Sequence, residues 1–514
     1  MSSDLIQSIV IVGGGTAGWL TAANLAKAFG NSSNSSVKVT LIESPDIPTI
    51  GVGEGTWPTM RATLEKLGLD ETEFMIACNA TFKQGTRFVN WAHDKEANHY
   101  FHLFTSIFDP TTFNLAPYWL KGLAGNIPYA DAVSAQGVAV DAGLAPKLIT
   151  SRAYEGVLNY AYHLDAGKFS ELLKKHAVEK LGVKLVYANV EQVKLDSHGG
   201  IESVRTDADE IIDGDFFVDC SGFKSLLLGE ALGIPFQSVS DTLLVDHAIA
   251  IQVPYSNEDS PINGCTHSTA QNAGWIWDIG LTNRRGVGHV YSSEFMSHDE
   301  AEATLRKYVG RHSDGLSSRL IPMNVGYRKK FWHKNCLAIG LSAAFVEPLE
   351  ASAIFLIEAS ANMLVDQLPA KKSGLLKAER KFNESFSFRW QRTVSFIKMH
   401  YVLSQRSGAF WEKNRTGSNV PELLLEDLEY WAEHPISAYD FSNVYEPFPM
   451  ESYQYVLYGM GFLTNLPLPC RYNQASKATA SFEKIKLISE KIKSTLPPQR
   501  ELLMKMRANG FSRV

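Results

Sequence analysis

The feature that most constrains this chain is a glycine-rich turn between two short apolar runs near its start. Residues 9–12 (IVIV) are β-branched and typical of a buried strand, and residues 13–18 (GGGTAG) follow at once. Apolar residues then recur at helical spacing over 19–29, and a second apolar run, 37–42, ends in Glu43. Strand, glycine turn, helix, strand and acid is the order of a βαβ dinucleotide-binding unit. The sequence therefore predicts a dinucleotide site here.

Each part of this unit has a physical role toward a dinucleotide. Gly13 permits the tight turn, Gly15 lets the backbone approach a pyrophosphate, and Gly18 allows the helix to pack closely on the strand. The N–H groups at the helix N-terminus face the phosphate anions, and Glu43 can accept hydrogen bonds from ribose hydroxyls. We therefore predict the following cofactor-binding residues in this unit: Gly13, Gly15, Thr16, Ala17, Gly18 and Glu43.

Length, charge and cysteine content narrow the class of protein. The 514 residues exceed what one simple core usually holds, so two or three subdomains are expected. The net charge of −6, without a long basic run, argues against a nucleic-acid partner. The five cysteines are scattered and odd in number, which indicates reduced thiols and no zinc site. Without a signal peptide or an apolar run of membrane-spanning length, we expect a cytoplasmic protein with no membrane and no metal partner.

The rest of the chain predicts the architecture. The stretch 47–58 (IPTIGVGEGTWP) favours an extended loop, followed by a helix over 59–67 capped by Thr59. A helix over 165–181 and strands over 183–193, 215–222 and 337–344 follow, and the pattern from 354 onward is mostly helical. A strand such as 215–222 often returns beside the first glycine turn in flavoproteins of the monooxygenase kind. The expected fold is therefore α/β, with a Rossmann-type FAD-binding domain of that kind. We place this catalytic domain at 1–355 and a mainly helical module that covers the substrate at 356–514.

Two local patterns remain ambiguous from the residues alone. Lys83 lies among Phe82, Phe88 and Trp91, and its simplest interpretation is a surface side chain whose alkyl part covers apolar neighbours. The stretch 98–104 (NHYFHLF) has two histidines three residues apart, but no carboxylate or cysteine at fitting spacing supports a metal site. A packed aromatic wall is the better interpretation of that stretch.

Taken together, several short stretches resemble the flavin-dependent tryptophan halogenases. The resemblance covers the chain from residue 9 to about residue 462, and its motifs occur in the family's order. They are GGGTAGW (13–19), IGVGEGTWP (50–58), TFK with F and NW downstream (81–91), FHLF (101–104), GWIWDI (274–279) and FVEPLEASAI (345–354).

The resemblance implies a specific reaction. The protein would use FADH2 delivered by a separate flavin reductase, and O2 as co-substrate would form a flavin hydroperoxide. Chloride or bromide would attack it to give hypohalous acid, which would pass through an internal tunnel to an electron-rich aromatic such as indole or a tryptophan-like compound. The alternatives are a flavin-dependent aromatic monooxygenase and a catalytically altered flavin-binding paralogue. A homodimer is left open.

The resemblance also assigns catalytic residues. Lys83 matches the family lysine that handles the oxidant, and an ammonium can polarise the oxygen of hypohalous acid. Glu350 matches the family glutamate, a base that takes the proton from the halogenated ring. Without the resemblance, Glu350 would be interpreted as a helix-start acid stabilised by the helix dipole.

Further positions match binding sites of the family. Ser352 and Ala353 correspond to the backbone N–H groups that hold the halide. Cofactor contacts are implied for Leu341 and Ile354 at the isoalloxazine, Glu54 in the strap over the flavin (residues 50–58), and Val190 on the adenine side.

On the substrate side, His102 and Phe104 match aromatics that sandwich the substrate ring. Trp275 and Trp277 match the paired tryptophans that keep substrate away from the flavin; two core tryptophans alternating on a strand would look the same. The chain departs from the family at Gly280, where a proline is usual, and at Ala351, where a serine is usual. The residues that hold the amino acid portion of free tryptophan have no clear match; Tyr453, Tyr455 and Tyr458 lie in that region.

Overall fold

The computed structural model describes residues 4–30, 37–47, 53–105, 108, 112–466 and 468–512, and it divides into two compact units. Unit 1 comprises Met1–Asn79, Leu164–Val239 and Asn324–Trp390. Unit 2 comprises Ala80–His163, Ser240–Met323 and Gln391–Val514. Each unit is thus built from three separate stretches of chain, whereas a boundary near residue 355 was expected; that boundary stays a prediction. Residues 48–52 of the predicted strap region lie outside the described part.

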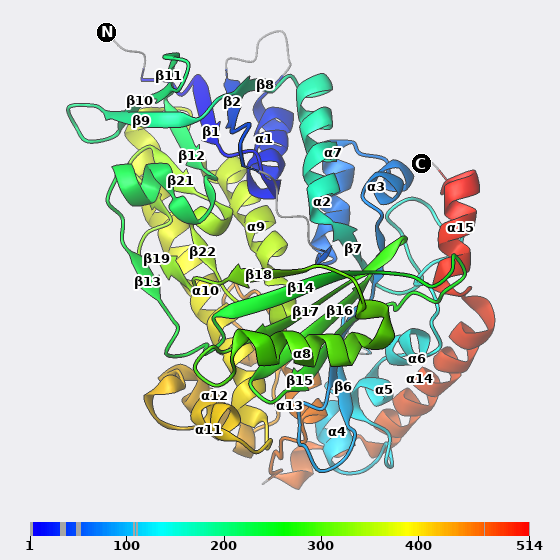
Figure 1. Cartoon of the computed structure of the whole chain (residues 1–514). Coiled ribbons are helices and arrows are strands. Elements are labelled where there is room, and N and C mark those ends of the chain that lie inside the picture. The colour runs from blue at the N-terminus through cyan, green and yellow to red at the C-terminus, as the bar shows by residue number, and fades with distance from the viewer. Residues whose placement is uncertain are drawn as a thin grey trace. The chain divides into compact units, whose positions relative to one another are not determined.

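Unit 1 is organised around a six-stranded sheet with the order β20-β21-β12-β1-β2-β8. Its centre is parallel, because β1 pairs in parallel with both β2 and β12. The predicted strand, glycine turn, helix and strand are all present (Figure 1). The strands are β1 (Ser8–Val12), β2 (Lys38–Glu43), β8 (Lys184–Tyr187), β12 (Phe216–Asp219), β20 (Trp332–His333) and β21 (Cys336–Ala338).

The helix that follows the glycine turn, α1, is deeply buried in unit 1. Helix α1 packs against both α7 and α9. Its run from Gly18 to Ala26 is buried on all sides, as expected for a helix covered by two others. The helices of unit 1 are α1 (Thr16–Phe29), α2 (Thr59–Leu67), α3 (Glu71–Ala77), α7 (Ala166–Glu179) and α9 (Ser352–Gln367).

The structure corrects two local predictions in unit 1. The run 183–193 is not one strand: β8 ends at Tyr187, and β9 (Val190–Leu195) belongs to a three-stranded sheet of order β11-β10-β9. Asn189 makes the break, because its side-chain amide donates to Asp46 and Asp207 at 2.7 and 3.0 Å. Thr59 is not the cap of α2, since Pro58 holds that position. The remaining strands of unit 1 are β3 (Gly53–Gly55), β10 (Ile201–Thr206), β11 (Ile211–Asp213), β13 (Phe236–Ser238), β19 (Gly326–Arg328) and β22 (Ala344–Phe345).

Unit 2 is organised around a seven-stranded sheet with the order β18-β14-β17-β16-β15-β5-β6. Its strands pair antiparallel except for β15 with β5. Every residue of β16 is buried, because this strand lies inside the sheet and both of its faces are covered. The strands are β5 (Gly85–Val89), β6 (His99–Leu103), β14 (His247–Pro254), β15 (Thr266–Gln271), β16 (Gly274–Gly280), β17 (Arg284–Tyr291) and β18 (Ser318–Pro322).

A short antiparallel pair and a set of helices complete unit 2. Strand β4 (Thr81–Lys83) pairs with β7 (Ala161–Asp165). As predicted, the C-terminal part of the chain is largely helical (Figure 1). None of the described helices is both long and apolar enough to cross a membrane. Helix α10 (Leu375–Leu403) has residues in both units, because this stretch of unit 1 ends at Trp390. The remaining helices are α4 (Ala116–Leu120), α5 (Tyr129–Val133), α6 (Gln136–Asp141), α8 (His298–Val309), α11 (Ala409–Arg415), α12 (Glu422–Glu433), α13 (Met450–Gly459), α14 (Ala475–Thr495) and α15 (Gln499–Asn509).

Candidate active site

The glycine turn of unit 1 has the geometry that a bound pyrophosphate needs. Gly13 has a φ of +116°, and a Cβ there would overlap the carbonyl oxygen of Cys220. A Cβ on Gly18 would overlap the carbonyl oxygen of Gly13, so the close helix–strand approach also requires glycine. Gly15 is different, because no heavy atom of the described residues lies within 4 Å of the position its Cβ would take. The turn is tight on its protein side and open at Gly15.

The start of α1 offers donors to this open space. Gly15 is the N-cap, and no side chain caps the helix. Thr16 and Ala17 are its first two residues, and N–H groups at such positions have no partner within the helix. An anion at this end is stabilised by these donors and by the helix dipole. The residues present therefore fit the diphosphate of FAD.

Glu43 ends β2 and is held in a fixed orientation. Its Oε2 accepts a hydrogen bond from the indole nitrogen of Trp19 at 3.1 Å, and its Oε1 accepts one from Nζ of Lys174 at 3.1 Å. Burial lowers the pKa of Lys174, but hydrogen bonds to Glu43 and Glu171 outweigh burial and raise it to about 12. A carboxylate has about four acceptor sites, so Glu43 keeps acceptor capacity for ribose hydroxyls.

Three further predicted cofactor positions lie in unit 1, one in a turn and two in strands. Leu341 belongs to the turn Gly340–Ser342, and a Cβ on Gly340 would come within 2.7 Å of the Cβ of Ala17. Leu341 therefore lies beside the phosphate turn. Glu54 is half-buried in β3, and burial raises the pKa of its carboxyl to about 7. Val190, in contrast, is the first residue of β9 and pairs with Thr206.

Glu350 and the predicted halide positions occupy one irregular segment of unit 1. Glu350 is 4% exposed and ends a short 3-10 turn, Pro348–Glu350. Ala351 then has a φ of +52° and a ψ of 39°, the left-handed conformation, and α9 begins only at Ser352. The segment from 348 to 354 is therefore not one continuous helix start, because Ala351 interrupts it. Ser352 and Ala353 are the first two residues of α9, which has no side-chain cap.

The end of the strap packs on this same segment. The indole nitrogen of Trp57 donates to the backbone oxygen of Glu350 at 2.9 Å. The Trp57 ring stacks on the ring of Phe355, with centroids 4.2 Å apart and an interplanar angle of 16°. Ile354, the predicted isoalloxazine contact, is buried in the same turn of α9. No role for Trp57 was predicted from the sequence, although a lone indole directly after GEGT was the signal available.

A second buried carboxyl of α9 also escaped the sequence-based predictions. Glu358 accepts hydrogen bonds from the hydroxyls of Thr63 and Thr59 at 2.5 and 3.0 Å. Burial raises the pKa of Glu358 to about 7, and the two hydroxyls oppose that rise. The contact joins α9 to α2, so the strap's last residues are fixed on α9 at more than one point.

In unit 2, Lys83 is buried and faces an aromatic ring. Its exposed fraction is 1%, so the surface interpretation made from the residues alone is wrong. The reason is the pairing of β4 with β7, which sets Lys83 opposite Ala161. Its Nζ lies 5.1 Å from the centroid of the Phe104 ring, within cation–π range. Lys83 and Phe104 are thus brought together.

A buried histidine shares the face of β4 and β7 that carries Lys83. His163 lies opposite Thr81, two residues from the Lys83–Ala161 pair, and alternation along both strands sets all of them on one face. Burial first, and the charge of Lys83 second, keep the pKa of His163 well below its ordinary value. The ring is therefore neutral at pH 7, and its Nε2 is 2.8 Å from the hydroxyl oxygen of Thr266.

His102 and the paired tryptophans are also buried in unit 2. The Nε2 of His102 lies 2.9 Å from the hydroxyl oxygen of Ser452, and its ring centroid is 5.7 Å from that of Phe396. Trp275 and Trp277 have ring centroids 6.4 Å apart in an edge-to-face arrangement. Trp277 packs over Gly288, its pairing partner on β17, where a Cβ would overlap the indole. The two tryptophans lie on the same face of β16, since they are two residues apart.

Two of the three tyrosines near the expected amino acid site, Tyr453 and Tyr455, have hydroxyl partners inside unit 2. The hydroxyl of Tyr455 donates to the backbone oxygen of Thr105 at 3.0 Å. The hydroxyl of Tyr453 donates to Glu446 at 3.4 Å, and the same carboxylate pairs with the buried Arg392 at 3.1 Å. Both hydroxyls are therefore used within the protein.

The predicted site residues divide between the two units. The pairing of Lys83 with Glu350 stays a prediction, because the first belongs to unit 2 and the second to unit 1. Unit 1 holds Gly13, Gly15, Thr16, Ala17, Gly18, Glu43, Glu54, Val190, Leu341, Glu350, Ser352, Ala353 and Ile354. Unit 2 holds Lys83, His102, Phe104, Trp275 and Trp277.

Comparison with known proteins agrees with the predicted class. The family model "Tryptophan halogenase" matches residues 8–475. The chain is 36% identical to the tryptophan 6-halogenase SttH of Streptomyces toxytricini over 523 residues, covering 97% of this chain and 98% of that protein. The crystal structure of a tryptophan halogenase from Shewanella frigidimarina has a TM-score of 0.96 and 45% identity, with 99% of each chain covered.

A third relative specifies the cofactor class. The flavin-dependent tryptophan C-6 halogenase of taromycin biosynthesis has a TM-score of 0.91 and 36% identity, covering 98% of this chain and 100% of its own. The predicted α/β fold and the halogenase class are confirmed, and the monooxygenase alternative is not favoured. This chain belongs to the tryptophan halogenase family of flavin-dependent halogenases.

Proposed function

We propose that this chain uses FADH2 and O2 to oxidise chloride or bromide to hypohalous acid, and that it halogenates an electron-rich aromatic such as indole or a tryptophan-like compound. The observation that carries the proposal is the buried Lys83, whose Nζ lies 5.1 Å from the ring centroid of Phe104. A buried ammonium beside an aromatic wall suits an electrophilic reagent that must be activated away from water.

The residues of unit 1 fit the cofactor. The N–H groups of Thr16 and Ala17 hold the diphosphate, the space at Gly15 admits it, and Glu43 binds the ribose. Reduced FAD, together with O2, supplies the two-electron oxidising power that the halide requires. As the resemblance to the family implies, a separate flavin reductase supplies the reduced form.

The halide binds at the N-terminus of α9. Ser352 and Ala353 contribute backbone N–H groups, and α9 is a 16-residue helix whose dipole favours an anion there. Because only backbone groups are required, the methyl side chain of Ala353 does not interfere. The N–H groups orient the halide without changing its charge.

Lys83 and Glu350 act on the reagent and on the substrate. The Nζ of Lys83 donates to the oxygen of hypohalous acid and so makes the halogen more electrophilic. Burial strengthens this interaction, since little water screens it. The carboxylate of Glu350 accepts the proton that leaves the ring when the halogen has added.

The aromatic residues of unit 2 bind the substrate. His102 and Phe104 present flat surfaces to its ring, and Trp275 and Trp277 keep it from the flavin side. The hydroxyls of Tyr453 and Tyr455 already have partners within the protein, which favours an indole ring over a free amino acid zwitterion.

One assay tests the proposed reaction. The protein is incubated with a flavin reductase, NADH, FAD, indole, and chloride or bromide, and products are analysed by mass spectrometry. A bromine isotope doublet supports the halogenase, whereas a product heavier by one oxygen indicates a monooxygenase. Bound FAD without product indicates a catalytically altered paralogue.

Lys83→Ala should abolish halogenation while FAD binding persists. Lys83→Arg is the comparison variant for Lys83→Ala, because it keeps the positive charge but changes the geometry of the hydrogen-bond donor. Halogenation retained in Lys83→Ala would remove Lys83 from the proposed role.

A further inference from the structure

The peptide group that follows Glu350 is held at both ends. Its oxygen, on Glu350, accepts the hydrogen bond from the Trp57 indole at 2.9 Å. Its N–H, on Ala351, donates to the backbone oxygen of Pro348 at 3.1 Å. A peptide unit is planar and rigid, so two hydrogen bonds fix the orientation of the whole plane. That plane directly connects Glu350 to the residues that begin α9.

The fixed plane matters because its neighbour has an unfavourable backbone conformation. Ala351 has a φ of +52°, a region that a residue with a Cβ rarely adopts. Without external support, this segment would relax toward an ordinary conformation. Any such change would turn the Glu350 side chain and the N–H groups of Ser352 and Ala353 together, since all follow from the same backbone angles.

Trp57 is itself held rigidly in unit 1. Its ring stacks on Phe355 at 4.2 Å, and Phe355 is one turn along α9 from Ala351. Two residues after Trp57, the hydroxyl of Thr59 donates to Glu358 of α9 at 3.0 Å. The indole N–H is therefore presented to the Glu350 oxygen by two independent contacts with α9.

We propose that Trp57 is a positioning residue of the active site: its indole N–H fixes the Glu350–Ala351 peptide so that the Glu350 carboxylate and the anion-binding N–H groups of Ser352 and Ala353 keep one mutual orientation. The proposal rests on the proposed function for what these groups bind. It adds a residue that touches neither halide nor substrate.

The variant that tests it is Trp57→Phe, which keeps an aromatic ring against Phe355 and removes the N–H. We expect the KM for bromide to rise and kcat to fall, together lowering kcat/KM by about three- to tenfold, the range for loss of one hydrogen bond. FAD affinity should fall less than kcat/KM, because the diphosphate is bound at the start of α1, although Trp57 belongs to the strap over the flavin. A second variant carrying 3-benzothienylalanine at position 57 replaces the N–H by sulfur without changing the ring shape, and should give the same kinetic loss.

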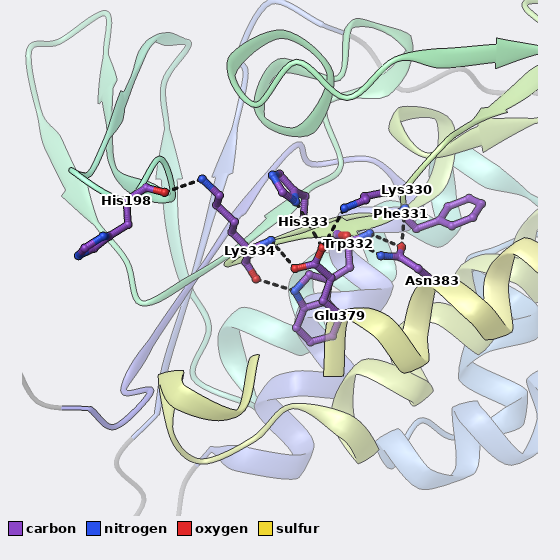
Figure 2. A network of polar contacts seen from close by, with 8 residues as sticks. All are labelled: His198, Lys330, Phe331, Trp332, His333, Lys334, Glu379 and Asn383. Carbon is purple, nitrogen blue, oxygen red and sulfur yellow. Dashed lines mark hydrogen bonds and ion pairs between the residues drawn. The ribbon is translucent and has the colours of Figure 1, made fainter. Parts of the chain in front are cut away.

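Unit 1 offers a matched control. The indole of Trp332 also donates to a backbone oxygen, that of Lys334, at 2.8 Å (Figure 2). This bond lies in a network around Glu379, which also binds the backbone N–H of Lys334. Trp332→Phe should lower thermal stability at least as much as Trp57→Phe does, because Trp332 is fully buried. Its halide KM and kcat should match those of the unmodified protein.

The outcomes separate this inference from the proposed function. Failure of the unmodified protein to oxidise any halide would refute the proposed function. In that case, bromide soaked into crystals still tests Trp57: anomalous signal at Ser352 and Ala353 should be strong in the unmodified protein and weaker in the Trp57 variants. Equal bromide signal in both, no signal in either, or kinetics of Trp57→Phe equal to those of Trp332→Phe would overturn the inference.

Discussion

The hydroxyl of Thr63 donates a 2.5 Å hydrogen bond to the carboxyl of Glu358, a residue of α9 that is 3% exposed. The contact joins α2 to α9 through a group that titrates near neutrality, since burial raises the pKa of Glu358 to about 7. The start of α9 carries the proposed halide site. The packing that supports this site is therefore sensitive to pH.

The pH dependence of stability follows from the direction of that shift. Because the folded-state pKa of Glu358 lies above its ordinary value of 4.5, the fold favours the protonated form. The stabilising contribution is complete below about pH 4.5 and is lost as pH rises through about 7. It amounts to about 3 kcal/mol. Glu358→Gln, which stays neutral, should flatten the fall in melting temperature between pH 5 and pH 8; an unchanged slope would contradict this.

A pair of glycine substitutions separates cofactor binding from folding. Gly15→Ala adds a methyl group where no described heavy atom lies within 4 Å, so stability should change by less than about 1 kcal/mol. FAD affinity should fall, because the methyl group occupies space proposed for the diphosphate. Gly13→Ala should strongly destabilise unit 1, since backbone strain and overlap with Cys220 each cost roughly 1–3 kcal/mol. FAD titration and thermal melting of the two variants check both expectations.

Gly288→Ala tests the placement of Trp277. The added methyl group would overlap the indole, which must then move, at a cost of about 1–3 kcal/mol of stability. If the paired tryptophans separate substrate from flavin, this variant should form halogenated product less efficiently per NADH consumed. The idea fails if Gly288→Ala melts lower but keeps the coupling of the unmodified protein.

Arg392→Met should be among the most destabilising substitutions in unit 2. The buried guanidinium pairs with Asp427 at 3.0 Å and with Glu446 at 3.1 Å. Removing it leaves the Glu446 carboxylate buried without its cation, which typically costs about 3–5 kcal/mol. The double variant Arg392→Met, Glu446→Gln should recover part of that loss. Chemical denaturation of both measures it, and a double variant no more stable than the single would count against the pairing.

The local pattern of the sequence was sufficient for the dinucleotide unit, because strand, turn and helix are decided by residues close together in the chain. Helix 59–67 was predicted with the bounds that the structure has. Its cap was not, because the Thr59 hydroxyl donates to Glu358, almost 300 residues away in the chain. The break at Asn189 was missed for the same kind of reason, since Asp46 and Asp207 create it.

Prediction of the candidate active site was also limited by contacts between residues that are far apart in the chain. From the neighbouring residues alone, Lys83 was interpreted as a surface side chain. Nothing nearby in the sequence indicates that β7 pairs with β4 and buries it. The role of Trp57 depends on the backbone oxygen of Glu350. Every residue type has a backbone oxygen, so the amino-acid pattern cannot indicate which one accepts a hydrogen bond. The assigned roles of Lys83, Glu350 and the halide positions came from family resemblance.

The three-stretch composition of unit 1 has a consequence for how the protein is made. Helix α9, which packs on α1, lies in the last of these stretches, Asn324–Trp390. During synthesis, α1 therefore leaves the ribosome more than 300 residues before α9, the helix on which it packs. Contacts of such long sequence separation form slowly and leave apolar surface open to aggregation. A nascent chain that ends before Trp390 should depend on chaperones, because its unit 1 is incomplete. A lower temperature during expression should increase the yield of native protein.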